Sequence, residues 1–465
     1  MNFPPSTYKR RRDCLRQEMG SGLLLFLGNG EVGINYTDNT YPFRQDSTFL
    51  YFFGISQPGV AAIIDIDEDR EVVFGDELTI DDIVWTGAVP TVADICHTVG
   101  VEETLPLKQL ASYLDRSRSK GQKIHFLPPY RADHRIWLWE LLQVKPEEQD
   151  KGASLPFIRA VVNLRNHKDS EELACIEQAV DLSTEMHLSA YHTVRPGMHE
   201  AEVAAAVAEV AARKGHALAF PTIATVRGQV LHNHGFIHSM AEGDIFLLDA
   251  GAEGPGYYAG DLSSSMPVGK RFTSRQEDIY AIHLESFLAA VEKLHPGTPF
   301  REVHLAAATK IAEGMKSLGL MRGDPAEAAA IGAYALFFPC GVGHMMGLDV
   351  HDMENLGEQY VGYAEGDKKS TQFGFKSLRL ARALEPGFVF TVEPGIYFIP
   401  ELIDQWQAER RFADFICYDK LHGWRDFTGL RNELNYVITA DGAKCLGTLH
   451  KPMTLREVYE ARDSF

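Results

Sequence analysis

Four carboxylates lie within or beside strongly apolar segments of the second half of this chain, and they restrict how it can fold. Glu393 interrupts the run GFVFTVEPGIYF, and Glu433 stands directly before the run LNYVIT. Asp249 and Asp261 belong to two apolar runs separated by a Gly-rich turn, a pattern typical of a β-hairpin. A buried carboxylate without a partner is costly or loses its charge. The fold must therefore bring cations or strong hydrogen-bond donors to these groups.

Two histidines follow a Gly-rich turn in the segment 337–354, FFPCGVGHMMGLDVHDME, where they are His344 and His351. Taken singly, each of these carboxylates and histidines more often has a structural role. An aspartate of this kind is usually a turn residue, a histidine is usually a buried or surface residue, and Glu433 can form a surface pair with Arg431. Taken together, the four carboxylates and His344 would balance two divalent cations if they converge. Oxygen ligands with one imidazole suit Mn²⁺, and Co²⁺, Fe²⁺ or Zn²⁺ are further candidates. A site with two such ions activates water and polarises a carbonyl, which predicts amide hydrolysis.

Length and composition exclude several classes of protein. A chain of 465 residues exceeds one ordinary core, so two domains are expected. The 45 Lys and Arg residues against 64 Asp and Glu give a net charge of −19, which argues against a nucleic-acid partner. Six cysteines without a CxxC motif favour a reducing compartment, so we expect the cytoplasm. No apolar stretch approaches the length of a membrane span, and no membrane association is expected.

Hydrophobic patterning divides the chain into two parts. In the first part, apolar runs predict strands at 22–28, 47–55, 60–67, 70–75 and 122–128. A helical pattern at 131–144 places Ile136, Trp137 and Leu141 on one face, and the polar segment 145–154 predicts a loop. The second part alternates long helical patterns, at 166–194, 199–215, 278–294 and 301–318, with strand patterns at 244–249, 257–268, 387–399 and 434–439. We therefore predict an α/β domain over 1–165 and an α+β domain over 166–465.

The motifs of the second part resemble those of a known enzyme family. DAG…GD, GVGHMMGLDVHD, TVEPGIY and RNELNYVIT are similar to the ordered metal-ligand motifs of the pita-bread metallopeptidases. The segment TDNTYPFRQDSTFLYFFGI (37–55) further resembles aminopeptidase P and prolidase. The resemblance implies an α+β pita-bread catalytic domain preceded by a smaller α/β N-terminal domain. It also implies an exopeptidase that hydrolyses the Xaa-Pro bond at the N-terminus of peptides through a water activated by two metal ions.

The same resemblance assigns roles to the five candidate ligands. Asp249 would bind one metal ion, and Asp261 and Glu433 would bridge both. His344 and Glu393 would complete the second ion's ligands. Glu393 is in addition the residue expected to take the proton from the bridging water.

Three further residues receive roles from the resemblance alone. His232, in QVLHNHG, and His351 would contact the substrate and stabilise the tetrahedral intermediate. Arg431 would hold the bridging carboxylate of Glu433 by a charge-assisted bond. His234 and His238 crowd the segment of His232, and we expect both to be structural.

The chain departs from the family pattern at a few places. Cys340 stands where the family commonly has a histidine that helps to form the substrate pocket, so the preference for proline is open at this stage. Segments 358–385 and 400–427 look like insertions, and we expect both to be surface excursions, with a lid or an oligomer contact as the alternative for either.

Other functions remain compatible with these observations. The first is a true prolidase, which cleaves only Xaa-Pro dipeptides. The second is a pita-bread domain that only binds a partner, and the third is metal-free hydrolysis of the creatinase kind; the presence of all five ligands disfavours both. By analogy with relatives, we expect a homodimer or homotetramer.

Overall fold

The computed structural model describes residues 3–233 and 235–464. The chain forms two compact units. The first contains the residues up to Arg165 together with Met353–Tyr360, and the second contains Asn166–Asp352 and the chain from Val361 onward. Within the described ranges, no helix is long and apolar enough to cross a membrane.

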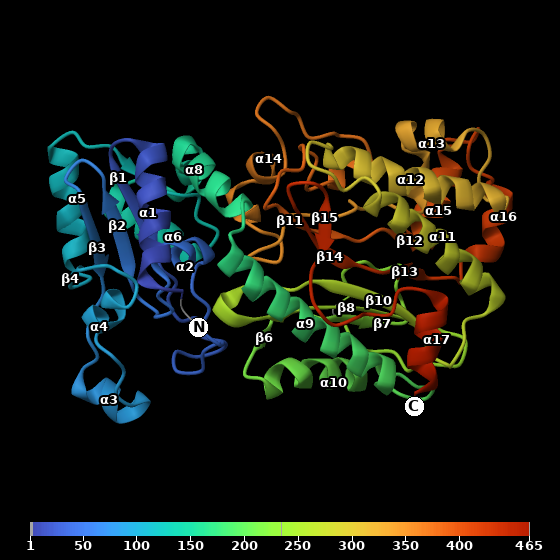
Figure 1. Cartoon of the computed structure of the whole chain (residues 1–465), viewed down its shortest axis with the longest axis horizontal. Helices are drawn as coiled ribbons and strands as arrows, with labels where there is room; N and C mark the ends of the chain where they lie inside the picture. Colours follow the sequence, from blue (N-terminus) through green and yellow to red (C-terminus); the bar gives the residue numbers. More distant parts are fainter. Residues whose placement is uncertain (1–2, 234, 465) are drawn as a thin grey trace. The chain divides into compact units, whose positions relative to one another are not determined.

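The first unit is an α/β layer built on a five-stranded sheet of order β4-β3-β2-β1-β5 (Figure 1). Its strands are β1 Leu23–Leu27, β2 Ala61–Asp65, β3 Arg70–Phe74, β4 Glu103–Leu105 and β5 Ile124–His125. β1 is antiparallel to β2 and parallel to β5. Side chains of α5 (Gln109–Ser119) and α6 (Ala132–Leu142) pack on the sheet, where Leu114 and Leu138 join its buried core. Strands covered in this way read as continuous apolar runs, which is why four of the five predicted strands are confirmed.

The strand predicted at 47–55 is wrong, because this segment forms helix α2 (Ser47–Phe53). The side chain of Asp46 accepts a hydrogen bond from the Phe49 amide at 2.8 Å, and Gly54 ends the helix in the left-handed conformation with φ 63°. Every residue of α2 is buried, so its apolar run has no period that would separate helix from strand. The caps at both ends decide for the helix.

Two details around α6 also differ from the sequence expectation. The predicted loop at 145–154 contains helix α7 (Pro146–Gly152), which begins with a proline followed by two glutamates, a favourable helix start. In α6 the buried face holds His134, Leu138 and Leu141, whereas Ile136 is 54% exposed. The predicted face is therefore correct for Leu141 and Trp137, which pack in or against the core, and wrong for Ile136.

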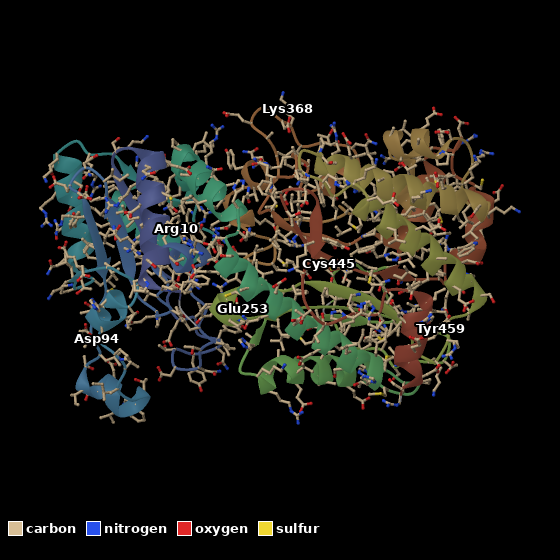
Figure 2. All side chains as sticks on the ribbon, viewed as in Figure 1. Arg10, Asp94, Glu253, Lys368, Cys445 and Tyr459 are labelled. Carbon is tan, nitrogen blue, oxygen red and sulfur yellow. The ribbon has the colours of Figure 1, made fainter. Side chains whose placement is uncertain are left out.

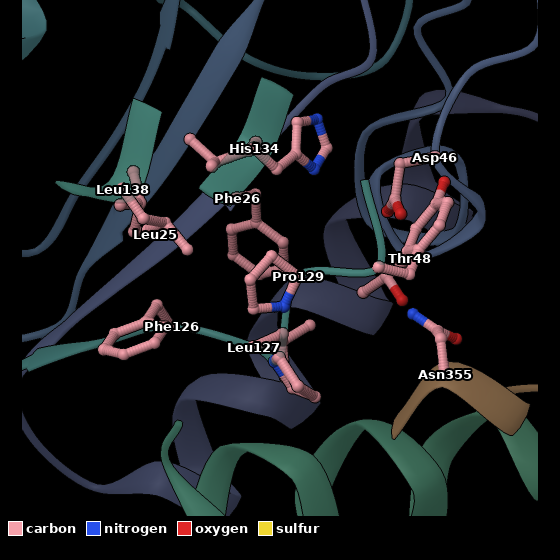
Figure 3. A pocket seen from close by; sticks show the side chains of 13 residues that line it. Leu25, Phe26, Asp46, Thr48, Phe126, Leu127, Pro129, His134, Leu138 and Asn355 are labelled. Atoms are coloured by element: carbon pink, nitrogen blue, oxygen red, sulfur yellow. The ribbon is translucent and has the colours of Figure 1, made fainter. Parts of the chain in front are cut away.

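A small cavity of about 40 Å³ lies in the first unit beside β1 (Figure 3). Phe26, His134, Leu138 and the ring of Pro129 line it, and Asp46 and Asn355 contribute polar atoms. This volume admits a few water molecules. It is too small for a peptide, so it is no candidate for a substrate site.

The second unit mixes helices with short sheets, in agreement with the predicted α+β class (Figure 1). Its long helices are α9 Ser170–Thr193, α10 Glu200–Arg213, α11 Ser274–Val291 and α12 Phe300–Ser317. One sheet has the order β10-β8-β7, a second the order β11-β14-β15, and β12 pairs with β13. These strands are β7 Ile223–Thr225, β8 Ile245–Ala250, β10 Leu262–Pro267, β11 Val389–Val392, β12 Gly395–Tyr397, β13 Gly429–Arg431, β14 Leu434–Ile438 and β15 Ala443–Cys445. Helix α9 contacts both β8 and β10 and so covers the first of these sheets.

The expected surface excursion at 358–385 is correct only in part. Lys368 lies at the exposed tip of a loop that projects from the unit, whereas Leu378 and Leu380 are 2% and 0% exposed (Figure 2). Segment 400–427 instead begins with helix α15 (Pro400–Ala408), whose Trp406 is 1% exposed and packs against Phe373 and Phe412. The expectation of a surface excursion is therefore wrong for 400–427.

Candidate metal centre

Two antiparallel strand pairs bring the four carboxylates together. In the first pair Ser263 of β10 lies opposite Asp249 of β8, and Asp261 directly precedes β10. In the second pair Val392 of β11 lies opposite Leu434 of β14. Glu393 follows β11 and Glu433 precedes β14, so the two glutamates stand at the same end of this pair. The amide of Glu433 donates to the carbonyl of Ser263 at 3.1 Å, which joins the two strand pairs.

His344 is fixed beside these carboxylates by strand β11. Its amide donates to Thr391 Oγ1 at 3.1 Å, and the amide of Thr391 donates to its carbonyl at 3.0 Å. The ring Nε2 then lies 3.3 Å from Asp261 Oδ2 and 3.4 Å from Glu393 Oε1. Asp261, His344 and Glu433 each offer one ligand atom, and these atoms lie within 4.8 Å of one another.

The tautomer of His344 indicates that a cation belongs here. Its Nδ1 lies 3.1 Å from the carbonyl oxygen of Met345, which can only accept, so Nδ1 carries the proton. Burial lowers the pKa of His344, which favours the neutral ring. The lone pair of Nε2 then faces carboxylate oxygens of Asp261 and Glu393. Three electron-rich atoms at such distances repel one another unless a positive charge lies between them.

The pKa values and hydrogen bonding of the carboxylates also indicate a site for a cation. Burial raises the pKa of Asp249 to about 7, although Arg431 opposes the shift. Burial, followed by the neighbouring carboxylates, raises the pKa of Asp261 and of Glu433 well above the usual range. Asp249 Oδ1 and Glu433 Oε1 are buried and have no hydrogen-bond partner among the described residues. Unsatisfied carboxylate oxygens beside one neutral imidazole fit divalent metal ions.

Arg431 organises the floor of the site, but its partner differs from the expected one. Its guanidinium donates to Asp249 Oδ2 at 2.5 Å, to Tyr397 Oη at 2.7 Å and to Ser263 Oγ at 2.9 Å. Glu433 is held instead by Ser263, whose hydroxyl donates to Oε2 at 2.9 Å. The expectation that Arg431 binds Glu433 directly is wrong, because β13 lies beside β8 and β10 and the long side chain extends across them.

A cavity of about 220 Å³ opens over these groups. Its lining includes every residue that the sequence singled out for metal binding or catalysis, together with Cys340 and an apolar wall: Phe220, Pro221, Ile223, Leu231, His232, Asp249, Asp261, Cys340, His344, Val350, His351, Glu393, Arg431 and Glu433. The ring centroids of His344 and His351 are 4.2 Å apart, and Arg379 Nε lies 3.2 Å from His351 Nδ1. His238 lies outside this lining, and His234 falls outside the described residues.

Sequence reasoning missed Ser263 and Tyr397, which hold the charged groups in place. Both are fully buried, and both contact Arg431. The signal for Ser263 was present in the run LSSSMP, where three serines interrupt an otherwise apolar strand. Buried hydroxyls need partners, so such a run indicates a polar network.

Comparisons with known proteins follow the same division of the chain. The family model for metallopeptidase family M24 matches residues 174–440, and the model for the aminopeptidase P N-terminal domain matches residues 8–127. The chain is 30% identical to an Xaa-Pro dipeptidase of Rattus norvegicus, with 97% of this chain and 91% of the relative covered. It is also 30% identical to an Xaa-Pro aminopeptidase of Escherichia coli K12, with 85% and 87% covered.

Solved structures agree with these matches. Zinc-substituted aminopeptidase P of Escherichia coli in complex with product shares 26% identity and a TM-score of 0.80, and covers 100% of this chain and 99% of its own. The aminopeptidase PepP of Pseudomonas aeruginosa shares 25% identity and a TM-score of 0.81, with 100% and 99% covered. The expected fold, a small N-terminal domain before a pita-bread domain, is confirmed.

Proposed function

The chain belongs to metallopeptidase family M24, and from this membership we infer a metal-dependent exopeptidase that hydrolyses the Xaa-Pro bond at the N-terminus of peptides. Relatives named Xaa-Pro aminopeptidase and aminopeptidase P cover most of the chain. The observation that carries the inference is the position of His344 Nε2, 3.3 Å from Asp261 Oδ2 and 3.4 Å from Glu393 Oε1 at the base of the cavity. A peptidase of this family needs such a cluster of ligands facing a substrate-sized space.

We propose that the chain binds two divalent ions. Asp249 would bind one ion, Asp261 and Glu433 would bridge both, and His344 and Glu393 would complete the second. Mn²⁺ is the preferred candidate because four of the five ligands are carboxylates; Co²⁺, Fe²⁺ and Zn²⁺ fit the same donors. When bound, such ions polarise a carbonyl and increase the acidity of water.

The protein's own groups then have distinct tasks. Glu393 would accept the proton of the attacking water, and Thr391 Oγ1 orients it by donating to Oε1 at 3.2 Å. His232 and His351, both in the cavity lining, would bind the substrate and stabilise the developing oxyanion. Arg431 would keep Asp249 ionised and in place.

The cavity also contains surfaces suited to an apolar substrate residue. Phe220, Pro221, Ile223 and Val350 form a wall that would accept the proline ring. Cys340 lies in the same lining, and burial raises the pKa of its thiol to about 12. We propose that Cys340 is a neutral, weakly polar contact for the substrate, not a nucleophile, because the thiolate is the reactive form.

A second candidate function is dipeptide hydrolysis. The relatives with 97% coverage of this chain include proteins named Xaa-Pro dipeptidase. Comparing hydrolysis of Ala-Pro with hydrolysis of Ala-Pro-Ala separates the two activities. Equal or faster cleavage of the tripeptide supports the aminopeptidase, and cleavage confined to the dipeptide supports the prolidase. A binding role without catalysis is disfavoured because all five ligands are present.

The setting of the enzyme is part of the proposal. We propose a cytoplasmic homodimer or homotetramer that acts on peptides and binds neither nucleic acid nor membranes. The net charge of −19 and the six cysteines, free in the structure, support this setting.

A peptide-library digestion tests the function directly. Protein loaded with Mn²⁺ would be incubated with peptides that vary at the first three positions, and products would be identified by mass spectrometry. We expect release of a single N-terminal residue only when proline is second, and loss of cleavage with chelator or in Asp261→Asn. Cleavage that ignores the second residue would overturn the proposal.

A further inference from the structure

Glu200, the first residue of α10, has a carboxylate that is fully buried and connects two distant points of the chain. Its Oε1 accepts from Thr225 Oγ1 at 2.8 Å and from the Val226 amide at 2.9 Å. Its Oε2 accepts from the His238 amide at 3.0 Å, and the ring Nδ1 of His238 lies 3.1 Å from both oxygens. One side chain thus holds both ends of the segment between Thr225 and His238.

We call residues 226–233 and 235–238 the His232 loop, because its His232 lines the cavity over the metal ligands. Gly228 packs against Gly429 near the start of the loop, but His232 is itself exposed and Val230 and Ile237 are 48% and 74% exposed, so packing holds these three side chains only weakly. A loop of this kind takes its conformation from its anchored ends and internal hydrogen bonds.

Thr225 continues the connection from the anchored end into the loop. Besides donating to Glu200, its Oγ1 accepts from the Arg227 amide at 2.9 Å and from Asn233 Nδ2 at 3.1 Å. Asn233 is adjacent to His232 in sequence. The path from the Glu200 carboxylate to the histidine therefore runs through one hydroxyl and one amide side chain.

We propose that Glu200 is a positioning residue for the proposed Xaa-Pro hydrolysis, which holds His232 in the cavity by tying together both ends of the His232 loop. The inference rests on the proposed function for its catalytic consequence. The proposal also gives His238 a structural role. This histidine binds Glu200 at one end of the loop and does not line the cavity.

The charge state of Glu200 agrees with this role. Burial alone would raise the pKa of Glu200. The hydrogen bonds donated by the backbone amides of His238 and Val226 and by the hydroxyl of Thr225 lower it below the usual value. The group is therefore an ionised carboxylate that only accepts hydrogen bonds. Glutamine at this position would turn one acceptor into a donor, which would face N–H groups and release one end of the loop.

The test compares Glu200→Gln, His232→Ala and the double variant in the full, metal-loaded protein. Glu209→Gln, on the same helix and 61% exposed, is the matched control. We expect Glu200→Gln to lower kcat between about tenfold and 100-fold, because small misplacement of a group near the reaction is costly. In the His232→Ala background the same substitution should lower kcat less than about twofold, since residues acting as a unit are not additive.

Two further readouts do not depend on activity. Amide exchange of the His232 loop should increase in Glu200→Gln and stay unchanged in Glu209→Gln, with the content of bound metal equal in all variants. If Glu200→Gln is insoluble, the isosteric Thr225→Val variant replaces it and should show the same pattern. Equal kcat losses in both backgrounds, or unchanged exchange of the loop, would overturn the proposal. If the wild-type protein cleaves no Xaa-Pro peptide, the proposed function fails. Amide exchange of the His232 loop then still tests whether Glu200 holds both ends of the loop.

Discussion

His344 Nε2 lies 3.3 Å from Asp261 Oδ2, although a hairpin supplies the aspartate and a distant Gly-rich turn supplies the histidine. The imidazole proton is on Nδ1, which donates to the Met345 carbonyl at 3.1 Å. The contact between the two residues is therefore repulsive when Asp261 is ionised and no cation is bound. The stability of the folded protein should therefore depend on whether a metal ion occupies this site.

Stability without metal should depend on pH in a defined direction. Burial raises the pKa of Asp249 from 3.8 to about 7, and of Asp261 and Glu433 further. For an acid with a raised pKa, stability is fully present below the unfolded value and is lost as pH rises through the folded value. Chelated protein should thus lose stability from about pH 4 to above pH 7, on the order of a few kcal/mol. Thermal melts with and without Mn²⁺ measure this, and a gap that narrows as pH rises would contradict it.

Removing one carboxylate should affect metal-free and metal-loaded protein in opposite ways. At alkaline pH, where the empty cluster ionises, Asp261→Asn relieves repulsion among its carboxylates, so chelated protein should gain on the order of a few kcal/mol of unfolding free energy. The same change removes a ligand and should abolish most activity and metal-dependent stabilisation. Asp278→Asn, at an exposed position of α11, is the control and should change neither. A chelated Asp261→Asn protein less stable than chelated wild type would refute the repulsion.

The ion pair between Arg431 and Asp249 should be worth far more than a surface pair of similar geometry. Arg431→Met leaves a buried carboxylate without its partner and should cost about 3–5 kcal/mol in metal-loaded protein. Arg425→Met breaks the pair with Asp404, whose side chains are 32% and 59% exposed, and should cost about 0–1 kcal/mol. Chemical denaturation compares the two. Similar losses would mean that burial does not set the strength of the Arg431 pair.

Substitutions of two neighbouring serines should have different effects, one mainly on metal affinity and the other mainly on stability. Ser263 Oγ donates to Glu433 and accepts from Arg431, whereas Ser264 Oγ lies 2.8 Å from His187 Nδ1 on the other side of β10. Ser263→Ala should weaken metal affinity by about 10–100-fold, the usual effect of removing a group that orients a ligand. Ser264→Ala should lower stability with little change in affinity. Competition with a chelating dye measures both affinities, and equal effects would exclude the special role of Ser263.

Much of this site was predictable because its ligands lie in runs with strong local signals. The hairpin of Asp249 and Asp261 follows from two apolar runs around a Gly-rich turn, and the apolar runs beside Glu393 and Glu433 each predict a strand. These are short-range patterns. The resemblance to a family added the order of the motifs, which no single run contains.

Other parts could not be predicted because they depend on three-dimensional neighbours. The apolar run at 47–55 fits helix or strand equally well, and capping by Asp46 and Gly54 decides it. The partner of Arg431 depends on which strands lie beside β13. The tie made by Glu200 connects residues 25 and 38 positions away, so no local pattern contains it.

Crystals grown with Mn²⁺ and measured at a wavelength where manganese scatters anomalously test the central claim most directly. Two anomalous peaks about 3.5–4 Å apart are expected. They should be enclosed by Asp249, Asp261, His344, Glu393 and Glu433. Well-ordered crystals with no anomalous peak among these five side chains would contradict it.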